Sequence, residues 1–145
     1  MFYMRLKNCI GTALALLLAL GALLFTQSLQ VCRLGDIEGK RSFYMHSPSS
    51  QAVVKEELFL WEFFEVEGES VVFVCEDREQ ILQDILERYG ASVRFEEQAG
   101  GSHSYYCYTE KWLDGIRIGE EFINLHIAFH GDSCAVGSPI IFGGF

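Results

Sequence analysis

The sequence predicts an α+β protein, in which an N-terminal signal or anchor helix precedes a small antiparallel sheet of about five to seven strands with one main helix on one face. Three observations predict this fold. Residues 9–25 carry no charge, one later segment repeats apolar residues at helical spacing, and the segments after it place apolar strands between turns. A chain of 145 residues, half of them apolar, is long enough for one domain with a core.

The N-terminal segment predicts export or membrane anchoring. The uncharged run Cys9–Phe25 follows Arg5 and Lys7, in the manner of the basic leader of an export signal. As a helix the run is about 26 Å long, close to the thickness of a bilayer core. We therefore interpret residues 1–30 as a transmembrane anchor or as a signal peptide, for which residues 26–28 offer the best cleavage site. The leader pattern places the C-terminal domain outside, either at the cell membrane or secreted.

Residues 31–50 are predicted to be a tether, and residues 51–145 an extracytoplasmic α+β domain. Gly35, Gly39 and the mixed charges around them are typical of a linker, and residues 47–50 form a turn. Residues 43–46 are either a short strand or part of the tether. Residues 53–66 are rich in aromatic and branched side chains, which predicts a long strand, with a short helical turn around residues 55–57 as the alternative.

One helix is predicted between Asp77 and Gly90. Asp77 can cap its N-terminus, with Gln80 completing a capping-box-like pair, and Gly90 supplies the left-handed residue at which helices end. Five apolar residues fall on one stripe of this helix: Ile81, Leu82, Ile85, Leu86 and Tyr89. We expect that stripe to pack against the sheet.

The remaining segments predict strands. One buried strand precedes the helix, at residues 70–75. The strands after it are separated by glycine-containing turns and cover residues 91–96, 103–109, 116–118, 122–130 and a last strand that includes 135–136 and 140–142. Consecutive strands at this spacing favour an antiparallel meander with one face covered by the helix.

The charge of the chain excludes one class of partner. The net charge is −9, and residues 42–145 alone contain 6 basic and 18 acidic residues, a net charge of −12. Because contacts to phosphates need lysine and arginine, we expect no nucleic-acid partner. The acidic surface also repels anionic lipid headgroups, whereas it keeps an exported domain soluble or attracts a basic partner.

Four cysteines outside the apolar leader permit disulfides. They are Cys32, Cys75, Cys107 and Cys134. An even number in an exported domain allows two bridges, and we expect Cys107 to pair with Cys134 because both lie in or beside predicted strands. Small buried thiols are the alternative. The sequence contains no CxxC motif, so neither a redox motif nor a zinc ribbon is indicated.

The histidines and possible nucleophiles give little indication of chemistry. His126 and His130 share a face of one predicted strand, about 13 Å apart, too far for one metal ion. We therefore expect no metal and no other cofactor. Cys107 or Ser104 could lie across the sheet from His126 as nucleophile and base, but the sequence has no nucleophile elbow and no phosphate-binding loop. We assign no catalytic residue.

An aromatic group in the predicted sheet is a possible interaction surface. Tyr106 and Tyr108 lie on one face of their strand, opposite Tyr105 and Cys107, and Trp112 follows them. If exposed, Tyr106, Tyr108 and Trp112 could bind a peptide or a glycan. Packing within the sheet is the alternative.

The C-terminal strands resemble those of a known family. Residues 124–128 (Asn-Leu-His-Ile-Ala), followed after a turn by residues 136–141 (Val-Gly-Ser-Pro-Ile-Ile), resemble the closing strands of YwmB-like proteins. Those are exported, sporulation-associated proteins of Gram-positive bacteria with a fold like that of the TATA-box-binding protein. The resemblance implies a curved sheet with a helix on it and no known catalytic residues. It does not imply DNA binding here, because the domain is acidic.

Together these features predict a non-catalytic, membrane-tethered or secreted extracytoplasmic module with an unknown protein partner, acting at the envelope during sporulation. The N-terminal helix would provide its contact with the membrane. An exported thiol-dependent or hydrolytic enzyme that uses Cys107 with His126 is the alternative, and a binder of a small ligand between helix and sheet is a third.

Overall fold

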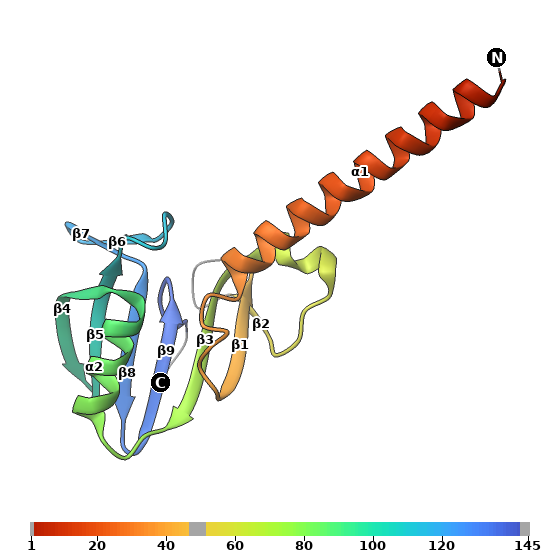
Figure 1. Cartoon of the computed structure of the whole chain (residues 1–145). Coiled ribbons are helices and arrows are strands. Elements are labelled where there is room, and N and C mark those ends of the chain that lie inside the picture. The colour runs from red at the N-terminus through yellow and green to blue at the C-terminus, as the bar shows by residue number, and fades with distance from the viewer. Residues whose placement is uncertain (1, 47–51, 143–145) are drawn as a thin grey trace.

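The computed structural model describes residues 2–46 and 52–142, with side chains from Ile10 onward. A long helix, α1 (Phe2–Val31), projects from a sheet domain that carries a second helix, α2 (Arg78–Tyr89), on one face (Figure 1). The arrangement confirms the α+β fold with an apolar N-terminal helix, an antiparallel sheet and one packed helix.

The main sheet has seven strands in the order β2-β1-β3-β9-β8-β5-β4, and every neighbouring pair is antiparallel. Its strands are β1 (Lys40–Met45), β2 (Val53–Lys55), β3 (Val66–Val74), β4 (Ala91–Ala99), β5 (Ser102–Thr109), β8 (Leu125–His130) and β9 (Ser133–Ser138). A separate hairpin pairs β6 (Ile116–Ile118) with β7 (Glu121–Ile123), and a short 3-10 helix, η1 (Leu60–Glu65), precedes β3.

The ends of α2 form as the sequence predicts. The side chain of Asp77 accepts a hydrogen bond from the Gln80 amide at 3.0 Å, which satisfies one of the free N–H groups of the first turn. Gly90 ends the helix in the left-handed conformation, with φ of 59°. Ile85 and Tyr89 are buried, so the predicted stripe faces the sheet.

The core lies between α2 and one face of the sheet, which we call the helix face. Buried side chains on that face come from every central strand: Val71, Cys107, Leu125, Ile127, Phe129, Cys134 and Val136. Two residues before β1, Leu34 and Ile37, enter the same cluster beside α2. The helix face is therefore covered by α2 and by residues 32–39 together.

The predicted tether is wrong for residues 31–42, and of the two interpretations of residues 43–46 the short strand is confirmed for residues 43–45. Leu34 is fully buried, Ile37 is 8% exposed, and Lys40–Met45 forms a strand paired with both β2 and β3. The glycines and charges of this segment resemble a linker, yet its few apolar residues are buried in the core because the sheet offers them apolar surface. Its last part, residues 47–50, lies outside the described residues.

Two predicted strands are also interrupted. Residues 53–66 contain only the short β2 before the chain turns into η1, because aromatic side chains lie on both faces of the segment and favour no single sheet face. Residues 122–130 divide at Asn124, whose amide side chain bonds the backbone of Thr109 and Trp112. The last strand ends at Ser138, since Pro139 has no N–H to donate to a ladder.

Candidate functional site at the junction of helix and sheet

The last turns of α1 lead directly into the domain. Residues 10–31 of α1 are long and apolar enough to cross a membrane, and none of the most apolar window of that segment is buried. Leu16, Leu17 and Leu18 are each 67% exposed. Val31, by contrast, is 6% exposed, and the chain behind it enters the core at Leu34. The exposed helix and the buried segment therefore meet within one turn.

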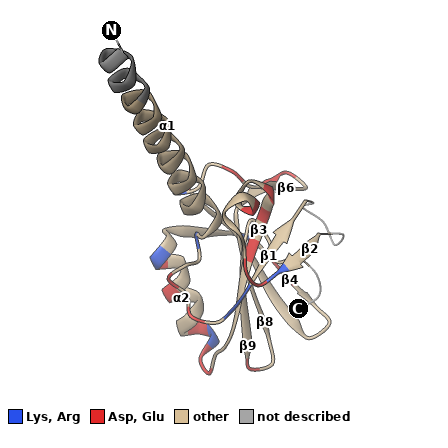
Figure 2. Ribbon diagram, turned by 90° about the vertical axis from the view of Figure 1, so that its right-hand side faces the viewer, with Lys and Arg blue, Asp and Glu red and all other residues tan. Residues whose placement is uncertain are grey.

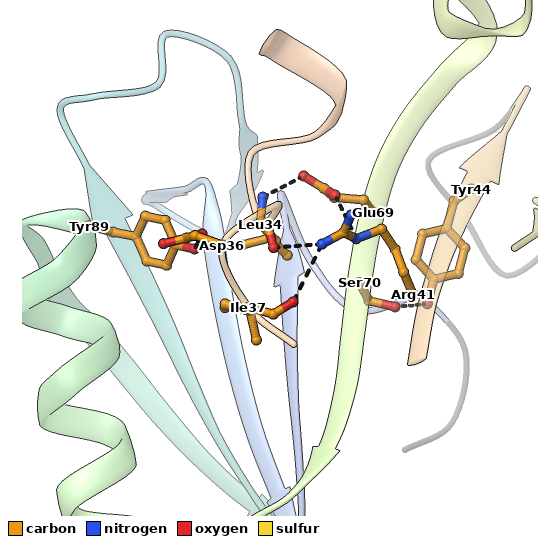
Figure 3. A network of polar contacts seen from close by, with 8 residues as sticks. All are labelled: Leu34, Asp36, Ile37, Arg41, Tyr44, Glu69, Ser70 and Tyr89. Atoms are coloured by element: carbon orange, nitrogen blue, oxygen red, sulfur yellow. Dashed lines mark hydrogen bonds and ion pairs between the residues drawn. The ribbon is translucent and has the colours of Figure 1, made fainter. Parts of the chain in front are cut away.

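A buried carboxyl group fixes this junction (Figure 3). The Leu34 amide donates a hydrogen bond to Oε1 of Glu69 on β3 at 2.9 Å. Arg41 of β1 donates from Nη2 to the Leu34 carbonyl at 2.8 Å, and its Nε lies 3.9 Å from Oε2 of Glu69. Glu69 and Arg41 thus hold both backbone groups of Leu34.

Burial changes the electrostatics of Glu69. Its side chain is 1% exposed, and desolvation raises its pKa to about 7, against the opposing effects of the Leu34 amide and of the Arg41 and Arg33 charges. Within the part of the chain that the structure describes, Oε2 of Glu69 and Nε of Arg41 have no hydrogen-bond partner. Near neutral pH the carboxyl group is therefore divided between its protonated and ionised forms.

Two further contacts hold the same segment from other sides. Asp36 accepts a hydrogen bond from the hydroxyl of Tyr89 and lies 3.6 Å from Arg88, both on α2. Burial, followed by this bond to Asp36, raises the pKa of Tyr89 well above its ordinary value. Arg33 pairs with Asp114 at 2.6 Å, and its guanidinium lies 5.4 Å from the ring centre of Trp112. Residues 33–41 are thus attached to β3, α2 and the β5–β6 loop.

The space beside Glu69 at this junction is small. A cleft of about 40 Å³ is lined by Gln30, Arg33, Glu69, Asp114 and Ser138, among others. That volume holds a few water molecules. A second and larger cleft of about 300 Å³ opens on the other side of Arg33, between the end of α1 and the β5–β6 loop, and is lined by Leu29, Trp112 and Asp114, among others.

The expected disulfide between Cys107 and Cys134 is wrong. Both thiols are free, and β8 lies between their strands. Cys107 pairs with Leu125 and Cys134 with Phe129, four residues further along β8. Two strand spacings and four residues of strand separate the Cα atoms by roughly 16 Å, far beyond the reach of a disulfide. Both thiols are instead buried apolar groups of the core.

The alternative dyad of Cys107 and His126 does not form. Cys107 points to the helix face and is fully buried, whereas His126 lies on the opposite face, where it pairs with Tyr106. Burial raises the pKa of Cys107 to about 12 and lowers the pKa of His126 to about 4. A neutral thiol and an imidazole on opposite faces cannot exchange a proton. Ser104, the other candidate nucleophile, pairs with Ala128 rather than with His126.

The three aromatic residues of the predicted interaction surface do not lie together. Tyr106 is stacked between Phe95 and His126, each with its ring centre 4.4 Å away. Tyr108 shares that face and contacts Phe122 at 5.9 Å, with Arg94 over its ring. Trp112 packs against Tyr89 of α2 at 5.2 Å. The two tyrosines therefore belong to packing within the sheet, and Trp112 to the helix side.

The residues that form the junction were not predictable from the sequence. Leu34 and Glu69 are distant in sequence, and no spacing connects them. A group of exposed apolar side chains on and beside η1 was not predicted either: Phe59, Leu60, Trp61 and Phe64. The sequence did contain a signal for that group. Apolar and polar residues do not alternate regularly over residues 59–64, so the segment fits neither a half-buried strand nor an amphipathic helix.

No protein-family model, curated protein or solved structure matches this chain. The resemblance to YwmB-like proteins therefore stays a prediction. Among the residues that the structure describes, no three His, Cys, Asp or Glu side chains are grouped so as to hold a metal ion.

Proposed function

We propose that this chain is a single-pass membrane protein whose α1 anchors an extracytoplasmic, non-catalytic domain close to the bilayer, where the domain binds another protein. The observation that carries this proposal is the junction: the exposed apolar helix is followed within one turn by residues buried in the domain core. A domain attached in this way stays next to the membrane, whereas a flexible tether would let it move away.

An uncleaved anchor accounts for α1 better than a cleaved signal. The apolar run is longer than the core of an ordinary secretory signal, about 7–15 residues. The best cleavage site, residues 26–28, lies inside the continuous helix α1. Gln27 there donates a hydrogen bond to the Phe63 carbonyl at 3.2 Å, so this part of the helix packs against the domain.

The surface of the domain favours a protein partner with basic groups. Figure 2 shows acidic residues along β3, and both acidic and basic residues on α2. The net charge of the chain after residue 41 is −12. Complementary charge steers association with a basic partner and repels polyanions. The resemblance of the last strands to YwmB-like proteins supports a place at the envelope during sporulation.

Fractionation of bacteria that express the full chain tests the anchor. We expect the chain to stay in the membrane pellet after an alkaline carbonate wash, at full-length mass, and to be digested by protease added to spheroplasts. The double substitution Leu17→Glu and Leu18→Glu, which places two charges in the apolar run, should release it from the pellet. Leu113→Glu, at a 97% exposed position outside α1, is the matched control and should change nothing. Recovery of the unchanged chain in the cytosol would exclude the proposal.

A further inference from the structure

An apolar patch of the domain remains exposed beside the anchor helix. It consists of Phe59, Leu60, Trp61 and Phe64, which we call the η1 patch, and these side chains are between 51% and 68% exposed. Phe59 and Trp61 stack with ring centres 5.0 Å apart, so the two rings form one aromatic pair. An exposed group of this kind in a folded domain marks a contact surface.

The position of η1 indicates what the patch contacts. Gln27, to which the Phe63 carbonyl is bonded, lies inside the segment of α1 that can cross a membrane, residues 10–31. Figure 1 shows η1 beside the last turns of α1, on the part of the domain from which the helix leaves. If α1 spans a bilayer, η1 lies where the hydrocarbon core meets the headgroups. Tryptophan and other aromatic residues are enriched at that depth.

The acidic residue inside the patch sequence does not face the proposed lipid contact. Glu62, the acidic residue within the patch sequence, is only 9% exposed. It bonds the Lys55 ammonium and the Phe59 amide, and these two bonds hold its pKa below its ordinary value. Glu65 at the end of η1 lies 3.4 Å from His46. The carboxylate of Glu62 is thus turned inward, while the rings beside it face out.

We propose that the η1 patch inserts into the headgroup region of the bilayer that α1 spans, as a second attachment of the domain to the membrane. The inference rests on the proposed anchor. The occupant is a zwitterionic lipid surface, because the patch lies at the end of the span and because the acidic domain gains no attraction from anionic lipid. Attachment through both α1 and the η1 patch fixes the orientation of the domain relative to the membrane. The end of the sheet with the β8–β9 hairpin and the start of α2, far from η1 in Figure 1, then faces away from the membrane.

Tryptophan quenching in reconstituted vesicles tests this contact. The chain contains only two tryptophans, Trp61 and Trp112. We would reconstitute the full chain into phosphatidylcholine vesicles with and without brominated acyl chains, and isolate each signal by comparing the wild type with Trp61→Phe and Trp112→Phe. Trp61→Phe keeps the fold, since this side chain is 68% exposed.

Insertion predicts that brominated lipid quenches Trp61 about twofold more strongly than Trp112, and that raising the ionic strength leaves this quenching unchanged. A tryptophan added by Val74→Trp is the matched control. Val74 is 78% exposed and lies at the other end of β3 from η1, so its quenching should be negligible. This control also remains informative if Trp112→Phe proves unstable.

Flotation of the vesicles separates failure of this inference from failure of the anchor. If the chain floats with the vesicles but Trp61 is quenched no more than the added tryptophan at position 74, the η1 patch does not contact lipid and the anchor proposal stands. A blue-shifted but unquenched Trp61 means that a second copy of the chain covers the patch, which also overturns the inference. If the chain does not float, the anchor proposal fails and the lipid contact fails with it.

Discussion

Burial shifts the pKa values of two residues of this domain in opposite directions: it raises that of Glu69 and lowers that of His126. The folded pKa of Glu69, about 7, lies above its ordinary value of 4.5, so its contribution to stability is complete below that value and is lost as the pH rises to about 7. The folded pKa of His126, about 4, lies below its ordinary value of 6.5, so folding becomes less favourable as the pH falls from 6.5 to 4. Between about pH 4.5 and 6.5 the two effects oppose each other.

Substitution of one of these residues should therefore leave the pH dependence of stability that the other one causes. Glu69→Gln should give a free energy of unfolding that rises with pH across this range, and His126→Phe one that falls with pH, each by an amount on the order of 2 kcal/mol relative to wild type. Chemical unfolding of the detergent-solubilised full chain at several pH values measures both slopes. If Glu69→Gln and the wild type show the same dependence of the free energy of unfolding on pH, the pKa of Glu69 is not raised in the folded protein.

The cysteines should differ in reactivity according to burial. Cys32 is partly exposed, whereas Cys75, Cys107 and Cys134 are buried, and burial raises the pKa of all four thiols. Since a reagent must also reach the sulfur atom, we expect maleimide to label Cys32 before the three buried thiols, which should react only on unfolding. Peptide mapping by mass spectrometry at increasing denaturant checks this order. Labelling of Cys107 in the native protein would show that its strand opens.

At the scale of the element, the segment between α1 and β1 contributes to the core. Leu34→Ala should destabilise the domain by about 2–5 kcal/mol, because it leaves a cavity between the sheet and α2. Leu113→Ala is the matched control at a 97% exposed position and should change the free energy of unfolding by less than about 0.5 kcal/mol. Thermal unfolding followed by circular dichroism measures both. A flexible tether would give the same small effect at both positions.

The stability of the domain should depend on the N-terminal cap of α2. Asp77→Ala removes the acceptor for the Gln80 amide and should cost about 1 kcal/mol. Gln83→Ala is the control on the same helix, since Gln83 is exposed and alanine favours a helix. Chemical unfolding of both variants gives the difference. Equal stability of the two variants would mean that the cap contributes nothing.

The elements differ in how far the sequence predicted them, for physical reasons. The helix at Arg78–Tyr89 was predictable because its cap, stripe and terminal glycine are local and agree with one another. The pairing of Leu34 with Glu69 was not, since it depends on contacts between residues 35 positions apart. The break at Asn124 was hidden in an alternating run, because hydrogen bonds to residues 109 and 112 override the strand pattern.

At the scale of the whole molecule, the order of the strands makes the N-terminal segment part of the domain. β1 lies between β2 and β3, so residues 40–45 close one side of the sheet. A chain that lacks residues 1–30 keeps Leu34, Ile37 and β1, and should unfold cooperatively in solution. A chain that lacks residues 1–41 loses both buried side chains and two residues of β1, and should show no cooperative transition. Circular dichroism and calorimetry distinguish these results. Equal stability of the two truncations would contradict the contribution of Leu34 and Ile37 to the core.

The sequence by itself determined the features that depend on neighbours along the chain: the apolar helix, the acidic character of the domain, the capped helix α2 and most of the strand segments after it. Only the tertiary structure decided that β9 pairs with β3 instead of completing a meander, that Leu34 and Ile37 belong to the core, that Cys107 is separated from Cys134 and from His126, and that η1 lies against α1. The reason is physical. Helix periodicity and charge are set by residues a few positions apart, whereas burial is set by which surfaces the folded sheet brings together.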